Sequence, residues 1–181
     1  MYLSYFCCAF AGLLVIGHIA GYAQDNGMTA WQAAGAVSAL AIANAATRVC
    51  SGAFVDAIGI RRYFLTLSVI QIVALLGMLP AGTSHSLLWV VAAVIGWNYG
   101  AVFTLFPVYT VQFFGPAAQG SNYGLLFSAW GIAGFFGPLA GGWLKDLSGT
   151  YTIPFYTATA VAVLAALAIV LCRAPAPKAD A

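Results

Sequence analysis

Six long apolar runs constrain the fold of this chain more than any other feature of its sequence. Each run is close to the roughly 20 residues that a helix needs to cross the hydrocarbon core of a bilayer. Charged side chains make up only 6% of the 181 residues, and almost all of them fall between the runs. A soluble core cannot bury that much apolar surface. The predicted spans are residues 3–22, 31–50, 63–79, 87–109, 123–143 and 153–172.

These spans predict an all-α membrane protein without a soluble domain. The expected connections are residues 23–30, 51–62, 81–86, 111–122 and 144–152. Residues 1–173 should form one six-helix bundle, followed by a disordered tail at 174–181. The net charge of +2 is too small for nucleic-acid binding. The four cysteines have neither disulfide nor metal-site spacing, so we expect no metal and no cofactor.

Six crossings place both termini on the same side of the membrane. That side holds four of the basic residues, whereas Lys145 is on the other side. The positive-inside rule therefore predicts cytoplasmic termini, and we expect a multi-pass protein of a bacterial inner membrane. The four residues are Arg61, Arg62, Arg173 and Lys178.

The pattern G-x-x-x-D-x-x-G occurs twice, after the second and after the fifth predicted span. Its two copies are Gly52, Asp56 and Gly59, and Gly142, Asp146 and Gly149. The offset contains three spans, so the second unit must be inverted relative to the first, as in secondary transporters. The predicted repeats are residues 1–85 and 86–173. The alternative is coincidence in a chain with 20 glycines.

The first copy of this pattern predicts a conformational latch. Gly52 and Gly59 allow close approach and a sharp turn. Asp56 can accept hydrogen bonds at the N-terminus of a neighbouring helix, while Arg61 and Arg62 face the cytoplasmic headgroups. The alternative is that the two arginines only set the topology of the chain.

Arg48 lies inside the second predicted span, and no acidic residue of any span is placed to neutralise it. A charge at that depth is costly and usually faces a cavity. Because a guanidinium pairs bidentately with a carboxylate, an anionic ligand is the predicted partner. Asn44, one helical turn earlier, can orient Arg48 or the ligand. The alternatives are that Arg48 extends to the interface, or pairs with a carbonyl group or Asp56.

Other polar groups at membrane depth are equally consistent with helix packing and with a pocket. They are His18, Gln71, Asn98 and Tyr99.

The string GAFVDAIGIRR at 52–62 resembles the cytoplasmic loop motif of the major facilitator superfamily, G-x-x-x-D-x-x-G-x-[RK]-[RK]. It departs from the fuller motif at Ala57, where a basic residue is common. NAATRVCSGAFVDAIG at 44–59 and NYGLLFSAWGIAGFFGPLAGGWLKDLSGTY at 122–151 resemble the oxalate/formate antiporter branch, which is related to monocarboxylate transporters. The resemblance covers essentially the whole chain and implies helices seven to twelve of a twelve-helix carrier.

The resemblance also implies roles for individual residues. Arg48 matches the helix-eight arginine that holds the substrate carboxylate. Trp130 stands where the oxalate transporter type has a second cation, a lysine, which favours a monocarboxylate or another singly charged organic anion. Tyr99 matches a region of pocket-lining aromatics, and Asn44 replaces an aspartate of many monocarboxylate carriers, which weakens proton coupling through that pair.

We therefore expect a secondary carrier that works by alternating access. Its predicted partners are the bilayer, a carboxylate substrate, and a missing amino-terminal half or a second copy of the chain, with a fragment of a longer carrier as the first expectation. The alternatives are a non-transporting remnant and a channel-like bundle. An aquaporin-type channel would need paired Asn-Pro-Ala motifs, and an enzyme would need a nucleophile and base, or metal ligands, at membrane depth.

Overall fold

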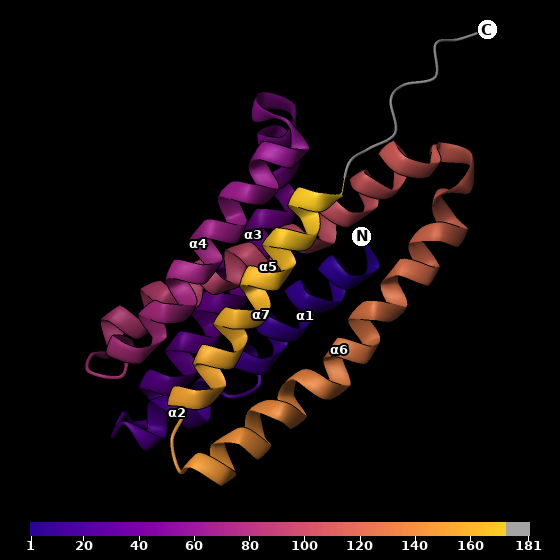
Figure 1. The fold of residues 1–181 in the computed structure, drawn as a ribbon. Coiled ribbons are helices and arrows are strands. Elements are labelled where there is room, and N and C mark those ends of the chain that lie inside the picture. The colour runs from indigo at the N-terminus through magenta and orange to yellow at the C-terminus, as the bar shows by residue number, and fades with distance from the viewer. Residues whose placement is uncertain (173–181) are drawn as a thin grey trace, which may run out of the picture.

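The computed structural model describes residues 1–172, and six helical units within them are long and apolar enough to cross a membrane. No strand occurs in this part of the chain. The predicted all-α fold is therefore confirmed. Arg173 and the predicted tail at 174–181, which includes Lys178, lie outside the described residues. The helices are α1 (Tyr2–Ile16), α2 (Ile19–Asp25), α3 (Ala30–Ile58), α4 (Ile60–Ala81), α5 (His85–Phe114), α6 (Gln119–Ser148) and α7 (Thr152–Leu171) (Figure 1).

The first span is a broken helix rather than the continuous one that its apolar run predicts. The break falls at Gly17 and His18, between α1 and α2. At this point the chain crosses Pro138 of α6, and His18 Nε2 lies 2.9 Å from the Pro138 carbonyl oxygen, to which it donates. A Cβ at Gly17 would lie 3.2 Å from the Pro138 side chain. Helix breaks of this kind are tolerated at membrane depth where a neighbouring helix satisfies the backbone.

The expected loop at 51–62 is almost entirely helical, which corrects the sequence prediction. α3 continues to Ile58, and α4 begins at Ile60. The connection is Gly59 alone, with φ +80°, a conformation that favours glycine. A helix satisfies its own backbone hydrogen bonds, so it need not end where the apolar run ends.

The expected loop at 111–122 is also mostly helical. α5 extends to Phe114, a short 3₁₀ turn covers Pro116–Ala118, and α6 begins at Gln119. Gly115, with φ +78°, makes the turn between them. Gly59 and Gly115 both lie at the end of the bundle where α1 begins and α7 ends, which we call the terminal end (Figure 1). Glycines with positive φ therefore reverse the chain at the terminal end.

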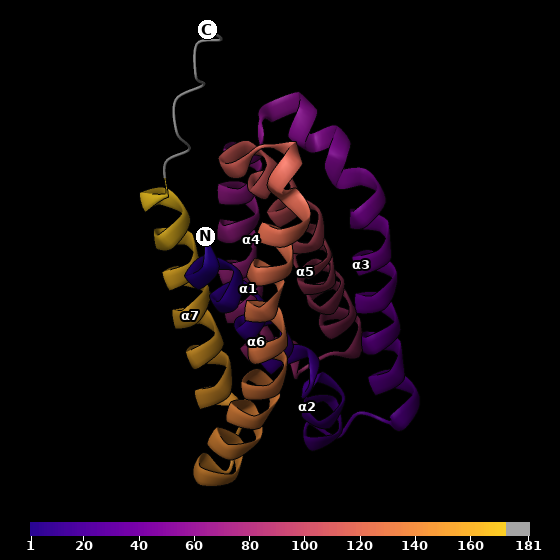
Figure 2. The same cartoon turned by 90° about the vertical axis from the view of Figure 1, so that its right-hand side faces the viewer.

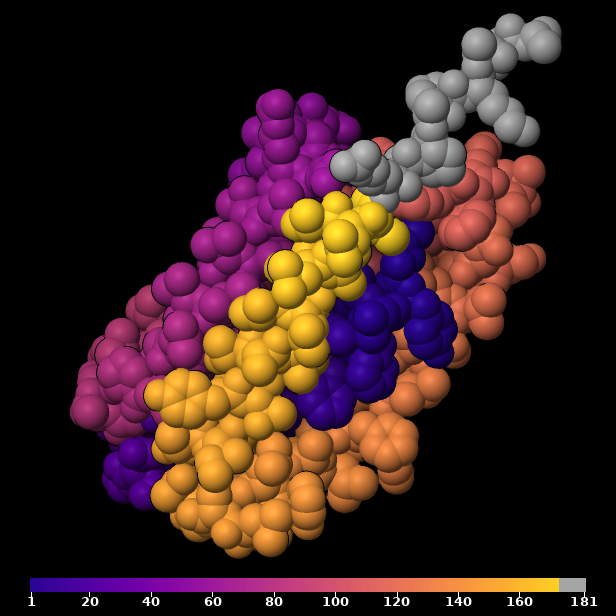
Figure 3. All heavy atoms as spheres, in the orientation of Figure 1, coloured from indigo at the N-terminus to yellow at the C-terminus, as the bar shows by residue number. Residues whose placement is uncertain are grey.

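The bundle has two well-packed central helices and two sparsely covered ones. About half of the first span and of α5 is buried, against 22% of α3 and 28% of α6. Figure 2 shows α5 running between α3 and α6. The space-filling view shows α1 in the gap between α6 and α7 (Figure 3). α3 and α6 therefore present large apolar surfaces that this part of the chain does not cover.

The buried core falls into two clusters along the length of the bundle. One, toward the terminal end, contains Tyr5 stacked on Phe106, with ring centroids 4.2 Å apart. The other includes Leu75, Met78 and Leu88, all fully buried. Because α5 contributes to both clusters, it is the helix against which the site residues are positioned.

Candidate functional site

α3 presents Asn44 and Arg48 on one face, one helical turn apart. The Arg48 Nε atom donates a hydrogen bond of 3.0 Å to Asn44 Oδ1, as the i, i+4 spacing predicts. Arg48 is exposed and Asn44 is half-buried. The Asn44 amide therefore fixes one edge of the guanidinium group and leaves its two terminal nitrogens without a hydrogen-bond partner in residues 1–172.

Two glycines of α5 bring α3 close enough for this arrangement. A Cβ at Gly96 would overlap the carbonyl group of Leu40, and one at Gly100 would overlap the backbone of Asn44. Small residues that allow backbones to approach are the common means of packing helices in membranes. The close approach places Arg48 directly beside the next turn of α5.

Phe103 of α5 lies under the guanidinium group of Arg48. The Arg48 Cζ atom is 4.3 Å from the centroid of the Phe103 ring, a distance typical of a cation–π contact. The contact supports the flat face of the guanidinium group without neutralising its charge. Across residues 1–172 the single ion pair joins Lys145 to Asp25, so Arg48 has neither Asp56 nor any other carboxylate as a partner there.

Tyr99 and Trp130 form the second half of the cluster. Trp130 Nε1, on α6, donates a hydrogen bond of 2.7 Å to the Tyr99 hydroxyl oxygen on α5. The Phe103 ring packs edge-on against both, with centroid distances of 5.4 Å to Tyr99 and 5.8 Å to Trp130. Phe127 stacks on Trp130 at 5.1 Å. One cation thus lies at the edge of an aromatic wall built by α5 and α6.

The four residues that the sequence singles out as a binding site are brought together by Phe103, which sequence reasoning missed. Arg48 reaches it from α3 and carries Asn44 through their hydrogen bond. Tyr99 and Trp130 reach it from α5 and α6. The one available signal was its spacing, because residue 103 is one turn after Tyr99 on the same helix face. This arrangement can bind one negative charge and surround an apolar body with aromatic rings.

A sequence model of the Major Facilitator Superfamily matches residues 1–181. The chain belongs to the major facilitator superfamily. Among curated relatives, it is 29% identical to the MFS-type transporter YhjX of Escherichia coli (strain K12) over 72% of this chain and 33% of that protein. It is 26% identical to monocarboxylate transporter 2 of Meriones unguiculatus over 92% of this chain and 35% of that protein.

A third relative within the superfamily is monocarboxylate transporter 12 of Rattus norvegicus. The identity is 28%, over 86% of this chain and 32% of that protein. The chain therefore spans about a third of the length of the curated relatives that it matches.

The superfamily's loop motif joins α3 to α4 at the terminal end of the bundle. Its residues differ in their contacts. Gly59 makes the predicted sharp turn. The predicted close approach at Gly52 is wrong for the described chain, since a Cβ there would meet nothing within 4 Å. Asp56 is exposed and has no partner in residues 1–172, so the expected contact with a helix N-terminus is absent there.

The two arginines of this motif also differ. Arg61 Nη2 donates to the Val170 carbonyl oxygen at 3.0 Å, close to the C-terminus of α7, where a positive charge is favourable. Arg62 is exposed. Arg61 therefore ties α4 to α7, a contact that the expected orientation toward headgroups did not include.

The second copy of the motif ends α6 at the opposite end of the bundle (Figure 1). Gly149 has φ +70° and closes α6 as Gly59 closes α3. Asp146 lies in the last turn of α6, and a Cβ at Gly142 would lie 3.5 Å from the His18 ring. The positive φ of the last glycine is thus the feature that both copies share.

Proposed function

We propose that this chain is the carboxyl-terminal half of a secondary transporter that carries a small monocarboxylate anion by alternating access. The observation that carries the proposal is Arg48, a cation at membrane depth with two free terminal nitrogens and no carboxylate partner in residues 1–172. The names of two relatives, which are monocarboxylate transporters, support this substrate class.

A single positive charge in the cluster favours a singly charged substrate. By the sequence resemblance, Trp130 stands where oxalate carriers have a second cation. Its indole nitrogen is bound to Tyr99 rather than free to meet a second carboxylate. The aromatic wall formed by Tyr99, Phe103 and Trp130 would contact the apolar part of the anion. Arg48 would hold the carboxylate through its two terminal nitrogens.

The sparsely covered faces of α3 and α6 would pack against another six-helix half, or against a second copy of the chain. In carriers of this kind the substrate site lies at the interface between the repeats or halves. Arg48 on exposed α3 and Trp130 on α6 would then line that interface. Asp56 and Arg62 have no ion-pair partner within residues 1–172. The motif at Gly52–Arg62 would therefore contact the other half and act as a latch.

Replacing Arg48 tests the proposal. Truncating one partner of a hydrogen-bonded charge pair costs about 2–5 kcal/mol, so Arg48→Ala should lower uptake at limiting substrate by roughly 30-fold or more. Arg48→Lys should also transport poorly, because an ammonium group lacks the bidentate geometry. The measurement is uptake of labelled lactate and formate by proteoliposomes that contain this chain together with a matching amino-terminal half.

The matched control is Val73→Ala, which changes a 63% exposed side chain of α4, away from α3 and α6. It should leave uptake within a factor of about two, since exposed positions away from a site are tolerant. Equal amounts of inserted protein must be confirmed for all variants. Normal uptake by Arg48→Ala would disprove the role of Arg48, and a preparation that conducts anions without saturation would favour a channel-like bundle.

A further inference from the structure

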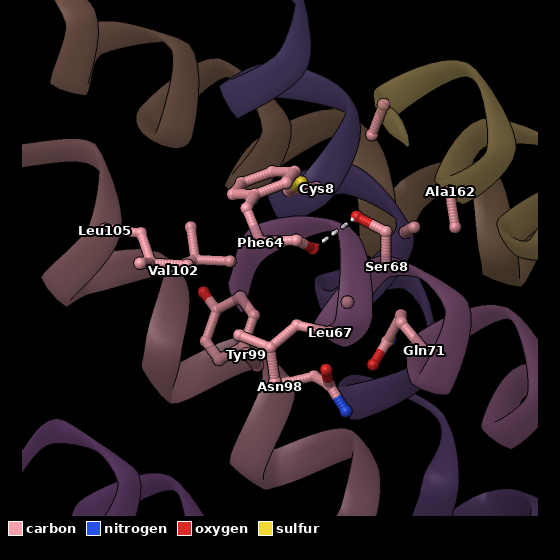
Figure 4. A pocket seen from close by; sticks show the side chains of 13 residues that line it. Cys8, Phe64, Leu67, Ser68, Gln71, Asn98, Tyr99, Val102, Leu105 and Ala162 are labelled. Atoms are coloured by element: carbon pink, nitrogen blue, oxygen red, sulfur yellow. Dashed lines mark hydrogen bonds between the residues drawn. The ribbon is translucent and has the colours of Figure 1, made fainter. Parts of the chain in front are cut away.

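A small cavity lies inside the bundle, on α1, α4, α5 and α7. Its volume is about 40 Å³, and apolar side chains make up most of its wall. Besides Cys8 and Tyr99, three polar side chains line it, namely Ser68 and Gln71 from α4 and Asn98 from α5. Figure 4 shows the amide groups of Gln71 and Asn98 turned toward the same space. The cavity is separate from the Arg48 cluster, with Tyr99 alone belonging to both.

The amide group of Asn98 has a fixed orientation and an unused oxygen. Its residue is only 5% exposed, and Nδ2 donates a hydrogen bond of 2.9 Å to the Val94 carbonyl oxygen of the preceding turn. The other end of the amide, Oδ1, is buried and has no partner in the described chain. A buried acceptor without a hydrogen bond destabilises the folded protein, which makes an unseen donor the expected occupant.

Gln71, on α4, also has a buried acceptor without a hydrogen bond. Its Oε1 atom lacks a partner in the described chain. Ser68, one turn earlier on α4, donates its hydroxyl hydrogen to the Phe64 carbonyl oxygen at 2.9 Å, so its lone pairs are what remain available to the cavity. Two acceptor oxygens cannot bond to each other, whereas one molecule with two donor hydrogens satisfies both.

We propose that this cavity holds buried water, which donates hydrogen bonds to Asn98 Oδ1 and Gln71 Oε1 and so bridges α5 to α4. A water molecule needs about 10–15 Å³ of such volume and two to four polar partners. The cavity therefore has room for about three to four molecules. A hard cation such as Ca²⁺ or Mg²⁺ would require about six oxygen ligands, and no carboxylate lines the cavity.

The bridge has a structural consequence at the next residue. Asn98 directly precedes Tyr99, which meets Trp130 in the Arg48 cluster. A water held between Asn98 and Gln71 would fix this turn of α5 against α4. The inference does not depend on which anion the protein carries, or on whether it transports at all.

Radiolytic footprinting of the full chain in lipid nanodiscs tests the proposal, because hydroxyl radicals made from an internal water oxidise the side chains beside it. Leu105 lines the cavity and is 1% exposed, whereas Leu88 lies on the same helix away from it and is fully buried. We expect Leu105 to be oxidised severalfold more than Leu88. Equal, background-level oxidation of both residues would overturn the proposal.

Leucine substitutions identify the acceptors. Asn98→Leu and Gln71→Leu each remove one acceptor, and the double variant removes both. In the double variant, the ratio of Leu105 to Leu88 oxidation should fall toward one. An unchanged ratio would overturn the roles of Asn98 and Gln71.

A cation is the other occupant to be excluded. The Tm of the wild-type chain is measured in sodium and in choline buffers, and a higher Tm in sodium would show that a cation, not water, is the occupant. If the variants fail to fold, the wild-type comparison still decides.

Discussion

Within residues 1–172, Arg48 makes one hydrogen bond and one cation–π contact, and neither removes its charge. Asn44 directs one edge of the guanidinium group inward, and Phe103 supports its face. The remaining edge is the natural place for a carboxylate, because two parallel N–H groups match its two oxygens. At the residue scale, the proposed preference for a substrate with one carboxylate rests on Arg48 being the single cation of this cluster.

Trp130→Lys should therefore change selectivity. A lysine there would add a second positive charge to the aromatic wall and would remove the hydrogen bond from Trp130 to Tyr99. We expect uptake of oxalate to rise relative to lactate by at least about tenfold, which corresponds to about 1.4 kcal/mol. The measurement is competition between the two labelled anions in proteoliposomes containing both halves.

Trp130→Met is the matched control for this change, since it removes the same indole group without adding charge. It should weaken uptake of both anions without a preference for oxalate. An equal shift toward oxalate in both variants would show that space, rather than charge, sets the selectivity.

At the scale of elements, α3 is held in place by two glycines of α5. Gly96 and Gly100 allow the backbones to touch, and this contact brings Arg48 onto Phe103. Gly52, although part of the loop motif, lies within α3 with open space around its α-carbon. Glycines of one helix pair therefore have different physical roles, which their sequence context does not distinguish.

Gly96→Ala and Gly52→Ala should have opposite effects on stability. The first inserts a methyl group against the Leu40 carbonyl, and such overpacking typically costs about 1–3 kcal/mol. The second replaces a helical glycine by alanine in open space, which should stabilise by about 0.5–1 kcal/mol. The measurement is the free energy of unfolding of each variant in mixed detergent micelles.

Both variants are compared with the unaltered chain in the same micelles. A loss at Gly52 as large as the loss at Gly96 would contradict the open surroundings that the structure gives Gly52. A loss of transport by Gly52→Ala without a loss of stability would instead indicate a contact with the other half of the carrier.

At the scale of the whole molecule, charged side chains join separate helices at both ends of the bundle. Arg61 joins α4 to α7 at the terminal end, and the 3.3 Å ion pair between Asp25 and Lys145 joins α2 to α6 at the opposite end. The ion pair is partly exposed, so it contributes little to stability. No comparable contact covers the outer faces of α3 and α6 within residues 1–172.

The uncovered faces of α3 and α6 predict that the chain alone does not transport. Reconstituted by itself, it should show no saturable exchange of formate, lactate or oxalate, whereas addition of a matching amino-terminal half should restore it. The reason is that Arg48 would otherwise face lipid rather than a closed site. Saturable exchange by the chain alone would overturn the half-transporter proposal and favour a homodimer.

The local part of the site follows from the sequence, because it depends on helical spacing. The six apolar runs predict the spans, and the i, i+4 spacing of Asn44 and Arg48 predicts their hydrogen bond. The glycine turns are also local, although the helices on either side of Gly59 and Gly115 are longer than the apolar runs that predict them. Helix ends were missed because an α-helix need not end at the boundary of an apolar run.

Sequence alone determined that this chain is a membrane protein of six spans with one cation at membrane depth. The reason is that the transfer of apolar and charged groups between water and lipid depends mainly on composition and helix periodicity. The tertiary structure decided what surrounds that cation. Phe103 reaches Arg48 because Gly96 and Gly100 allow α3 and α5 to approach, and Trp130 reaches Tyr99 from a separate helix. The break at His18 and the cavity beside Asn98 likewise arise from contacts between helices, and no local pattern encodes such contacts.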